Sequence, residues 1–215
     1  MSNENKIVAG ICVLFFIIIA VLFWKGPSLG QPSVNPANPD LLVKDTSHMT
    51  GKKGAKVTVV EFGDFECPAC AAVSPEINKL IDAYKTNPDF NFVFRNFPLS
   101  QHKNAIIAAE AAESAGAQGK YFEMERLLYS NQSEWGESTD PKPFLSKYAS
   151  SLALDMAKFQ RDMTSHAFTA TIQADATDGQ TIGIDHTPTI YINGIEQTDL
   201  QFETTKSLVE KLLAK

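Results

Sequence analysis

The chain has 215 residues, of which 44% are hydrophobic and 20% are charged, and its formal net charge is −6 at pH 7. This length fits one domain of ordinary size with a short extra segment, and the core of such a domain is large enough to need no disulfide staples. The acidic balance, without any basic cluster, argues against a nucleic-acid partner.

The N-terminal part of the chain predicts a membrane anchor. Residues 7–24 form an uncharged apolar run of about eighteen residues, long enough to span a bilayer and longer than the usual signal-peptide core. We expect a transmembrane signal anchor at 7–24 with residues 1–6 as a cytoplasmic tail; cleavage near Ser28–Gly30 is the alternative. The single lysine on each side of the run leaves the positive-inside rule undecided. Cys12 in this run is most simply a small apolar residue, with a reactive or acylated thiol as the second interpretation.

A proline-rich tether is expected after the anchor, over residues 25–41, because this composition cannot bury a core. Residues 42–215 then form the folded domain. Its first part, up to Ala55, is expected to be an irregular or short β lead-in at the domain edge, with His48 exposed to solvent.

The stretch from Lys56 to Cys70, KVTVVEFGDFECPAC, predicts a strand that runs into a helix. Its β-branched and aromatic residues are typical of a buried strand, and Gly63 and Asp64 then supply turn chemistry. Cys67 and Cys70 are three residues apart, so at a helix start both sulfurs lie on one face of the first turn.

The segment Cys67-Pro68-Ala69-Cys70 has the features of a thiol–disulfide exchange site. Pro68 would occupy the first helical position, where proline is favoured, and the free N–H groups of the first turn would point at the Cys67 sulfur. We therefore expect the Cys67 pKa to fall below the free value of about 8.5. A zinc site is one alternative, but it needs two more ligands, and the four histidines lack the H-x₃₋₅-H spacing. A structural disulfide is the other; we expect no metal and no cofactor.

The rest of the chain predicts one more strand, a helical block and a C-terminal β–β–α unit. Apolar residues keep helical spacing to about Lys85, and three phenylalanines alternate between residues 90 and 94 as the core face of a strand. The block at about 102–183 is expected to be helical almost throughout. Strands at 189–192 and 195–198 around an Asn-Gly turn, and a helix at 203–214, complete the order.

Three features resemble the thioredoxin superfamily. They are Glu61 six residues before Cys67, Pro75 inside the following helix, and the Thr187–Pro188 step that leads into a strand. Within that superfamily, FGDFECPAC, FVFRNFPLSQH and TPTIYING are similar to the DsbA-type branch. The resemblance implies an α/β thioredoxin fold with an inserted all-helical domain, preceded here by one N-terminal transmembrane helix.

The resemblance also implies roles for the site residues. Cys67 is expected to be the exposed sulfur that a substrate thiolate attacks, and Cys70 its buried partner. Substrate backbone would lie along Thr187 and a cis Pro188. Glu61 would be a buried proton acceptor near Cys70; an outward strand residue is the alternative.

The charges around the motif bear on its redox potential. Some DsbA-type oxidases have a histidine inside the motif, where this chain has Ala69, and Asp64 and Glu66 would raise the Cys67 pKa if they are close and unscreened. His186 is expected to be the only histidine beside Cys67 and to offset this charge, with an exposed loop residue as the alternative. These features predict an oxidase of moderate potential.

The expected activity is disulfide formation outside the cytoplasm, because disulfides persist there. The chain is expected to be a single-pass membrane protein and a monomer. Its partners would be reduced proteins or peptides and a membrane or extracytoplasmic protein that reoxidises the cysteine pair. A reductase or isomerase of the same fold is the first alternative. A membrane-tethered chaperone without redox chemistry is the second, and the intact cysteine pair argues against it.

Overall fold

The computed structural model describes residues 37–215. The expected cytoplasmic tail, the anchor at 7–24 and most of the tether at 25–41 lie outside the described residues. Within 37–215, no helix is both long enough and apolar enough to cross a membrane.

The last residues of the expected tether are part of the folded domain, which corrects the predicted boundary. Pro39–Leu42 forms a short helix, α2, and Asn38 caps it by accepting a hydrogen bond from the Asp40 N–H at 3.0 Å. The helix is fixed there because Leu42 is buried among apolar residues of one sheet face.

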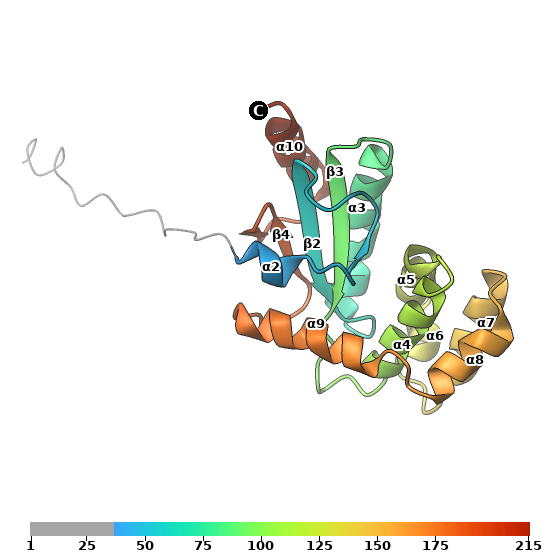
Figure 1. Cartoon of the computed structure of the whole chain (residues 1–215). Coiled ribbons are helices and arrows are strands. Elements are labelled where there is room, and N and C mark those ends of the chain that lie inside the picture. The colour runs from blue at the N-terminus through green and yellow to red at the C-terminus, as the bar shows by residue number, and fades with distance from the viewer. Residues whose placement is uncertain (1–36) are drawn as a thin grey trace, which may run out of the picture. The chain divides into compact units, whose positions relative to one another are not determined.

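A five-stranded sheet with the order β1-β3-β2-β4-β5 forms the centre of the fold (Figure 1). Strand β2 runs parallel to β3, and the other neighbouring pairs are antiparallel. In this register Glu61 of β2 lies opposite Phe94 on one side and Ile190 on the other. The strands are β1 (His48–Met49), β2 (Val57–Gly63), β3 (Phe90–Asn96), β4 (Thr189–Ile192) and β5 (Ile195–Gln197).

The helices confirm the predicted thioredoxin architecture with a helical insertion. The segment between β3 and β4 contains α4 to α9, and the orange α9 runs back from this insertion to the sheet (Figure 1). The described helices after α2 are α3 (Pro68–Tyr84), α4 (Ala105–Gly116), α5 (Tyr121–Ser130), α6 (Gln132–Trp135), α7 (Lys142–Ser151), α8 (Met156–Thr164), α9 (Thr169–Thr181) and α10 (Phe202–Leu213).

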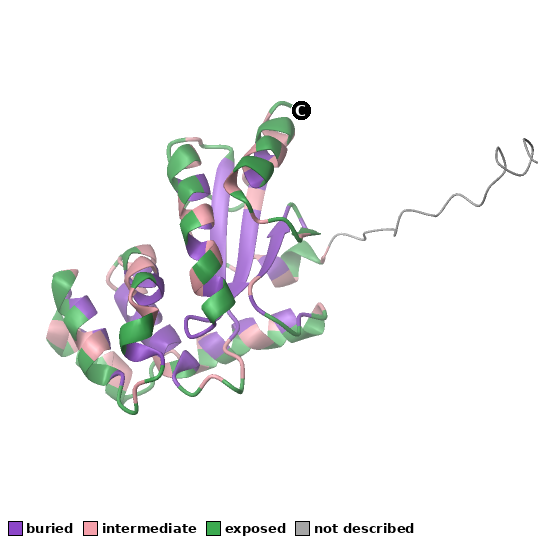
Figure 2. Ribbon diagram, turned by 180° about the vertical axis from the view of Figure 1, so that it is seen from behind, coloured by how far each residue is buried: buried purple, intermediate pink, exposed green. Residues whose placement is uncertain are grey.

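Helices cover both faces of the sheet, and the central strands are buried accordingly (Figure 2). Alternate residues of a strand point to opposite faces. Val59 faces the cluster that contains α3 and α10, whereas Val60 and Phe62 face the cluster beside α9 and α2. Glu61, next to Val60, therefore points to the same side as Cys70.

The lead-in before β2 docks at the sheet edge, as predicted, because β1 pairs with β3. The expectation that His48 is solvated is wrong. Its Nε2 lies 2.8 Å from Oε2 of Glu113, and its ring stacks on that of Tyr121 with centroids 3.6 Å apart. A carboxylate and an aromatic ring from the insertion hold His48 in place.

Candidate active site

The end of β2 positions the two cysteines at the start of α3. Cys67 is the N-cap residue, Pro68 lies in the first turn, and Pro75 is inside the helix, as predicted. The Cys67 N–H donates to the Asp64 carbonyl at 3.1 Å, which closes the turn between strand and helix. Both cysteines are free thiols.

Only the tip between the two sulfurs is exposed. Pro68 and Ala69 are exposed, whereas Cys67 is 6% exposed and Cys70 is fully buried. The expectation that Cys67 is an accessible thiol therefore needs correction, although its exposure still exceeds that of Cys70. The loop at Thr187 covers Cys67, since the Thr187 carbonyl oxygen lies 3.4 Å from the Cys67 sulfur.

The pKa values of the two thiols are shifted in opposite directions. A hydrogen bond from the Cys70 thiol lowers the pKa of Cys67 to about 5 against the opposing effect of burial, with further lowering by Thr187 and by the N–H groups of Cys70 and Ala69. Burial raises the pKa of Cys70, and its hydrogen bond to Cys67 and the charge of Glu61 raise it further. The reduced site therefore holds a thiolate on Cys67 and a proton on Cys70.

The loop before β4 forms the other wall of the site. The Thr187–Pro188 peptide bond is cis, as expected. Thr187 is 8% exposed, and its hydroxyl finds no hydrogen-bond partner among residues 37–215. A buried hydroxyl beside the Cys67 sulfur can donate to the thiolate or to an incoming polar group.

Glu61 is buried on the side of the sheet where Cys70 lies, so it is not an outward strand residue. Burial raises the pKa of its carboxyl to about 8, and the charges of Glu125 and Cys67 act in the same direction. A carboxyl group with such a pKa exchanges protons readily near neutral pH. Glu125 is a second buried acid that the sequence analysis did not single out.

The helical insertion holds the loop that precedes Cys67. Asp64 accepts hydrogen bonds from the Glu66 N–H and the Leu99 N–H, both at 2.8 Å. The Glu66 carboxylate accepts from the Asn104 N–H at the start of α4. Both carboxylates therefore hold the loop in place through hydrogen bonds. From the sequence alone they were considered as unscreened charges near Cys67.

Helix α6 adds a second clamp on the same loop. The Gln132 side-chain amide donates to the carbonyls of Phe65 and Cys67, at 2.8 and 3.0 Å. Phe65 is buried with its ring 5.1 Å from Phe94 and 5.2 Å from Tyr129. The insertion therefore sets the position of the Cys67 backbone.

His102 also lies at this site, so the expectation that His186 is the only histidine beside Cys67 is wrong. His186 is exposed and contacts the neighbouring Asp185, at 2.9 Å. His102 Nδ1 lies 2.7 Å from Oδ2 of Asp64. Burial opposes the charged form of His102, but the hydrogen bond to Asp64 and the charges of Asp64, Cys67 and Glu66 raise its pKa. Sequence spacing could not show this, because His102 is brought to the site only by the crossover after β3.

We expect His102→Asn to raise the Cys67 pKa by about half a pH unit, because it removes a cation but keeps a donor toward Asp64. The measurement is the rate of alkylation of the reduced protein as a function of pH. His186→Asn is the matched control and should leave the Cys67 curve unchanged. Coincident curves for wild type and His102→Asn would show that the histidine charge does not reach the thiolate.

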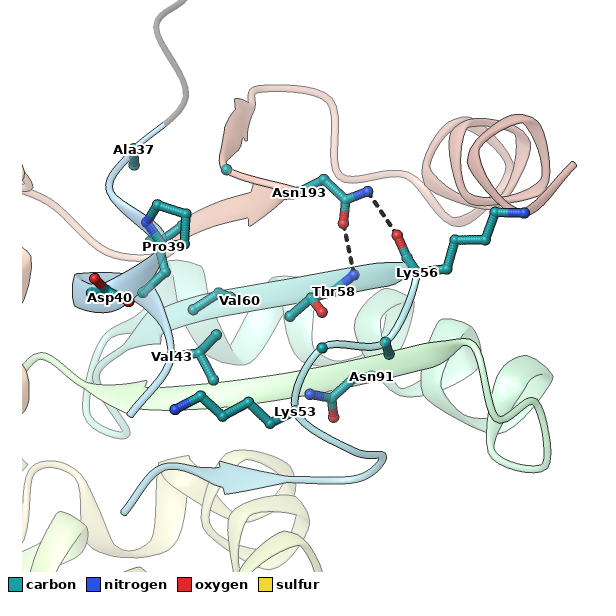
Figure 3. Close-up of a pocket in the computed structure, with 14 residues that line it drawn as sticks. Ala37, Pro39, Asp40, Val43, Lys53, Lys56, Thr58, Val60, Asn91 and Asn193 are labelled. Carbon is teal, nitrogen blue, oxygen red and sulfur yellow. Dashed lines mark hydrogen bonds between the residues drawn. The ribbon is translucent and has the colours of Figure 1, made fainter. Parts of the chain in front are cut away.

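One pocket of the domain lies away from the two cysteines (Figure 3). It has a volume of about 420 Å³, and α2, the Lys53–Lys56 loop and β2 line it. Asn193 closes one side by bonding to the Thr58 N–H at 2.8 Å and the Lys56 carbonyl at 3.0 Å. Thr58 and Val60 face this pocket, so it lies on the sheet side opposite Glu61 and Cys70. It is not part of the cysteine site.

Comparison with known proteins gives matches over nearly the whole described domain. The sequence model of the family described as Thioredoxin matches residues 43–211. Among curated proteins, the Na⁺/H⁺ antiporter NhaA 1 of Mycobacterium sp. (strain KMS) is 33% identical over 193 residues, or 85% of this chain and 29% of that protein. The chain thus spans less than a third of the length of this relative.

Three solved structures share the fold. BdbD of Bacillus subtilis, in its oxidised form, matches with a TM-score of 0.70 and 24% identity over 85% of this chain and 98% of its own. A thioredoxin-like oxidoreductase from Silicibacter pomeroyi DSS-3 matches with a TM-score of 0.66 and 27% identity, over 83% of this chain and 99% of its own. The thiol-disulfide exchange protein alpha-DsbA2 of Wolbachia pipientis matches with a TM-score of 0.67 and 22% identity, over 80% of this chain and 90% of its own.

Proposed function

Because the chain belongs to the thioredoxin family and resembles DsbA-type proteins, we propose that it is a thiol–disulfide oxidoreductase that forms disulfides in reduced proteins or peptides. The observation that carries this proposal is the pair of unequal thiols, with the Cys67 pKa lowered to about 5 and that of Cys70 raised. A low pKa makes one sulfur a good nucleophile and leaving group, and a high pKa keeps the other protonated.

The exchange starts with the disulfide form of the pair. A substrate thiolate attacks the Cys67 sulfur, the Cys67–Cys70 bond breaks, and its electron pair leaves on Cys70, which takes a proton. A second substrate thiolate then attacks the substrate sulfur of the mixed disulfide. Cys67 leaves as a thiolate, so two electrons have moved from the substrate to the protein.

Substrate would approach over the exposed tip and the loop before β4. Pro68 and Ala69 are exposed, and Thr187 and the half-buried Pro188 border the Cys67 sulfur. The Thr187 hydroxyl would serve as a donor to the sulfur or to substrate backbone. Glu61 would exchange the proton of Cys70, because it is buried on the same side and its charge acts on that thiol.

The low pKa of Cys67 also supports oxidation, and not reduction, of the substrate. A pKa of about 5 lies between the values of about 7 for thioredoxin and about 3.5 for DsbA. A stabilised thiolate favours the reduced form and hence oxidation of the substrate. We place the reduction potential between about −270 and about −120 mV, as an oxidase of moderate strength.

The place of action is proposed from the N-terminal sequence. The apolar run at 7–24 would anchor the chain in the cell membrane, with the domain outside the cytoplasm, where disulfides persist. A membrane or extracytoplasmic redox partner would reoxidise the pair.

The full chain tests function and location together. Expressed in a bacterium that lacks its own periplasmic dithiol oxidase, it should restore disulfides to exported proteins, and Cys67→Ser should not. In parallel, residues 37–215 should oxidise a reduced, unfolded protein in a glutathione buffer. Residues 37–215 include all the residues of the cysteine site described above.

The outcomes separate the alternatives. Activity of the purified protein without rescue in cells would contradict the location. A potential near −270 mV would identify a reductase rather than an oxidase. Full rescue by Cys67→Ser would favour a chaperone that uses the fold without redox chemistry.

A further inference from the structure

Three buried polar atoms have no hydrogen-bond partner among residues 37–215: Glu61 Oε1, Glu125 Oε2 and the Tyr129 hydroxyl. Glu61 and Tyr129 interact electrostatically with Cys70, and Glu125 interacts with Glu61 and Tyr129. Glu61 and Glu125 are 1% and 2% exposed, and Tyr129 is 5% exposed. Unsatisfied buried polar atoms are uncommon in proteins. Three of them in side chains that act on one another indicate a polar site inside the core.

The stripe of α5 that faces the sheet places Glu125 in this site. Tyr121, Glu125 and Tyr129 are four residues apart, so they lie on one side of the helix. The Tyr121 ring is 6.0 Å from that of Phe94, which is the β3 partner of Glu61 in the sheet. Glu125 lies one turn further along the same stripe, toward β2.

Tyr129 marks the far end of the stripe. A Cβ atom built on Gly63 would lie 3.0 Å from the Tyr129 hydroxyl, so this hydroxyl reaches the backbone of β2. Gly63 and Glu61 are two residues apart in the strand and therefore face the same side. Glu125 and Tyr129 thus approach β2 on the side to which Glu61 points.

The charges agree with this placement. Burial raises the pKa of Glu61 and of Glu125, and the Glu125 charge adds to the effect on Glu61. Burial also raises the pKa of Tyr129, with Cys70, Glu61 and Glu125 contributing. The titratable or charged groups that act on this site come from four elements. They are Cys67 at the N-cap of α3, Cys70 in α3, Glu61 of β2, Asp64 of the following loop, and Tyr121, Glu125, Arg126 and Tyr129 of α5.

Resting on the proposed function, we propose that Glu125 is a positioning residue whose charge acts on Glu61 and so sets when Glu61 exchanges a proton with Cys70. Two carboxyl groups in one buried site cannot both ionise cheaply, and their titration belongs to the pair. The Tyr129 hydroxyl is the neutral donor that borders the pair. The inserted helix α5 therefore contributes to the chemistry of the thioredoxin core.

The proton transfer accompanies closure of the disulfide. With a mixed disulfide on Cys67, the pair holds one proton, and the Cys70 thiol passes its proton to the Glu61 carboxylate. The Cys70 thiolate attacks the Cys67 sulfur, the Cys67–Cys70 bond forms, and the bound thiolate leaves with its electron pair. The pair then holds two protons.

Dithiobis(nitrobenzoate) tests this step with the full-length reduced protein. The first coloured thiolate is released by Cys67 and the second by Cys70, so one trace reports both thiols. Glu125→Gln removes the charge of Glu125 but keeps its size, so the Glu61 pKa should fall. The pH midpoint of the second phase should move down by about one pH unit, while that of the first phase stays in place.

Glu110→Gln is the matched control. Glu110 is 2% exposed in the same insertion, but it contacts His166 and Thr169, at 3.0 and 2.6 Å. This variant should move neither midpoint. Glu125→Asp keeps a carboxyl of shorter reach and should give an intermediate second midpoint, which serves if Glu125→Gln does not fold.

An unchanged second midpoint in the folded Glu125 variants would overturn the role of Glu125. That result differs from failure of the proposed function, in which wild type itself would release no second thiolate from the reagent. A shift of both midpoints together would also overturn the role of Glu125. Such a shift would indicate a change of the whole cysteine site and not an effect on Glu61.

Discussion

Replacing Cys70 with serine is expected to turn the protein from a catalyst into a trap. When Cys67 attacks a substrate disulfide, the mixed disulfide on Cys67 should accumulate, because Cys70, which would attack Cys67 and release the substrate, is gone. Release would then depend on other thiols alone. Cys67→Ser should form no mixed disulfide, because the nucleophilic thiolate is absent. Non-reducing gels and intact-protein mass spectrometry after incubation with an unfolded protein that carries a disulfide measure the adduct.

A matched pair at Cys70 separates trapping from acidity. The largest contribution to the low Cys67 pKa is the hydrogen bond from Cys70. Serine keeps a donor at this position and alanine does not, so Cys70→Ala should show a higher alkylation midpoint for Cys67 than Cys70→Ser. Both variants should trap substrate. Equal midpoints would assign the low pKa to the backbone N–H groups, and adducts on Cys70 in a Cys67→Ser variant would reverse the assignment of the nucleophile.

The elements of the site follow closely from local sequence. A β-branched run, a Gly-Asp break and proline after Cys67 specify strand, turn and helix, and the structure places β2 and α3 accordingly. The helical character of 102–183 was also predictable, because its apolar residues repeat with helical spacing. These features are set by residues that are neighbours in the chain, so they can be predicted from a single sequence.

What the sequence could not provide are contacts that close over long distances. Asp64 and Glu66 looked like two charges that oppose a thiolate, but they bind His102 and N–H groups of residues after β3. The burial of Cys67 depends on the Thr187 carbonyl, 120 residues away in sequence. Such partners are set by the crossover of the fold and not by spacing.

Glu125 and Arg95 left a weaker signal that could have been used. Glu125 interrupts the apolar stripe of α5 between Tyr121 and Tyr129, and Arg95 ends an aromatic strand. A charged residue in a core pattern predicts a buried partner or a shifted pKa. The pattern cannot name that partner, and for Arg95 it is the later helix α9.

Arg95→Met is expected to be among the most destabilising single changes in the domain. Arg95 is fully buried and donates to Asp175 at 2.7 Å, to Asp178 at 2.6 Å, and to the Leu41 and Leu42 carbonyls at 2.8 and 3.0 Å. It thereby joins β3, α9 and the end of α2. Removing one partner of a buried ion pair costs about 3–5 kcal/mol, because the other charge stays buried and unpaired. Urea unfolding at pH 7 measures the loss, and Arg126→Met, which breaks an exposed pair with Asp82, should lose less than about 1 kcal/mol.

The pH dependence identifies the cause of that loss. Burial raises the pKa of Asp175 while Arg95 opposes this, so without the arginine the folded-state pKa should rise further above the unfolded value of about 3.9. The folded variant then binds more protons than the unfolded chain, and its stability falls as pH rises through that interval. The difference between Arg95→Met and wild type should therefore be smaller at pH 4 than at pH 7, and Asp175→Asn in the Arg95→Met background should reduce its pH dependence. A difference that is the same at both pH values would indicate lost packing against Phe62, whose ring lies 5.4 Å from the guanidinium, as the main effect.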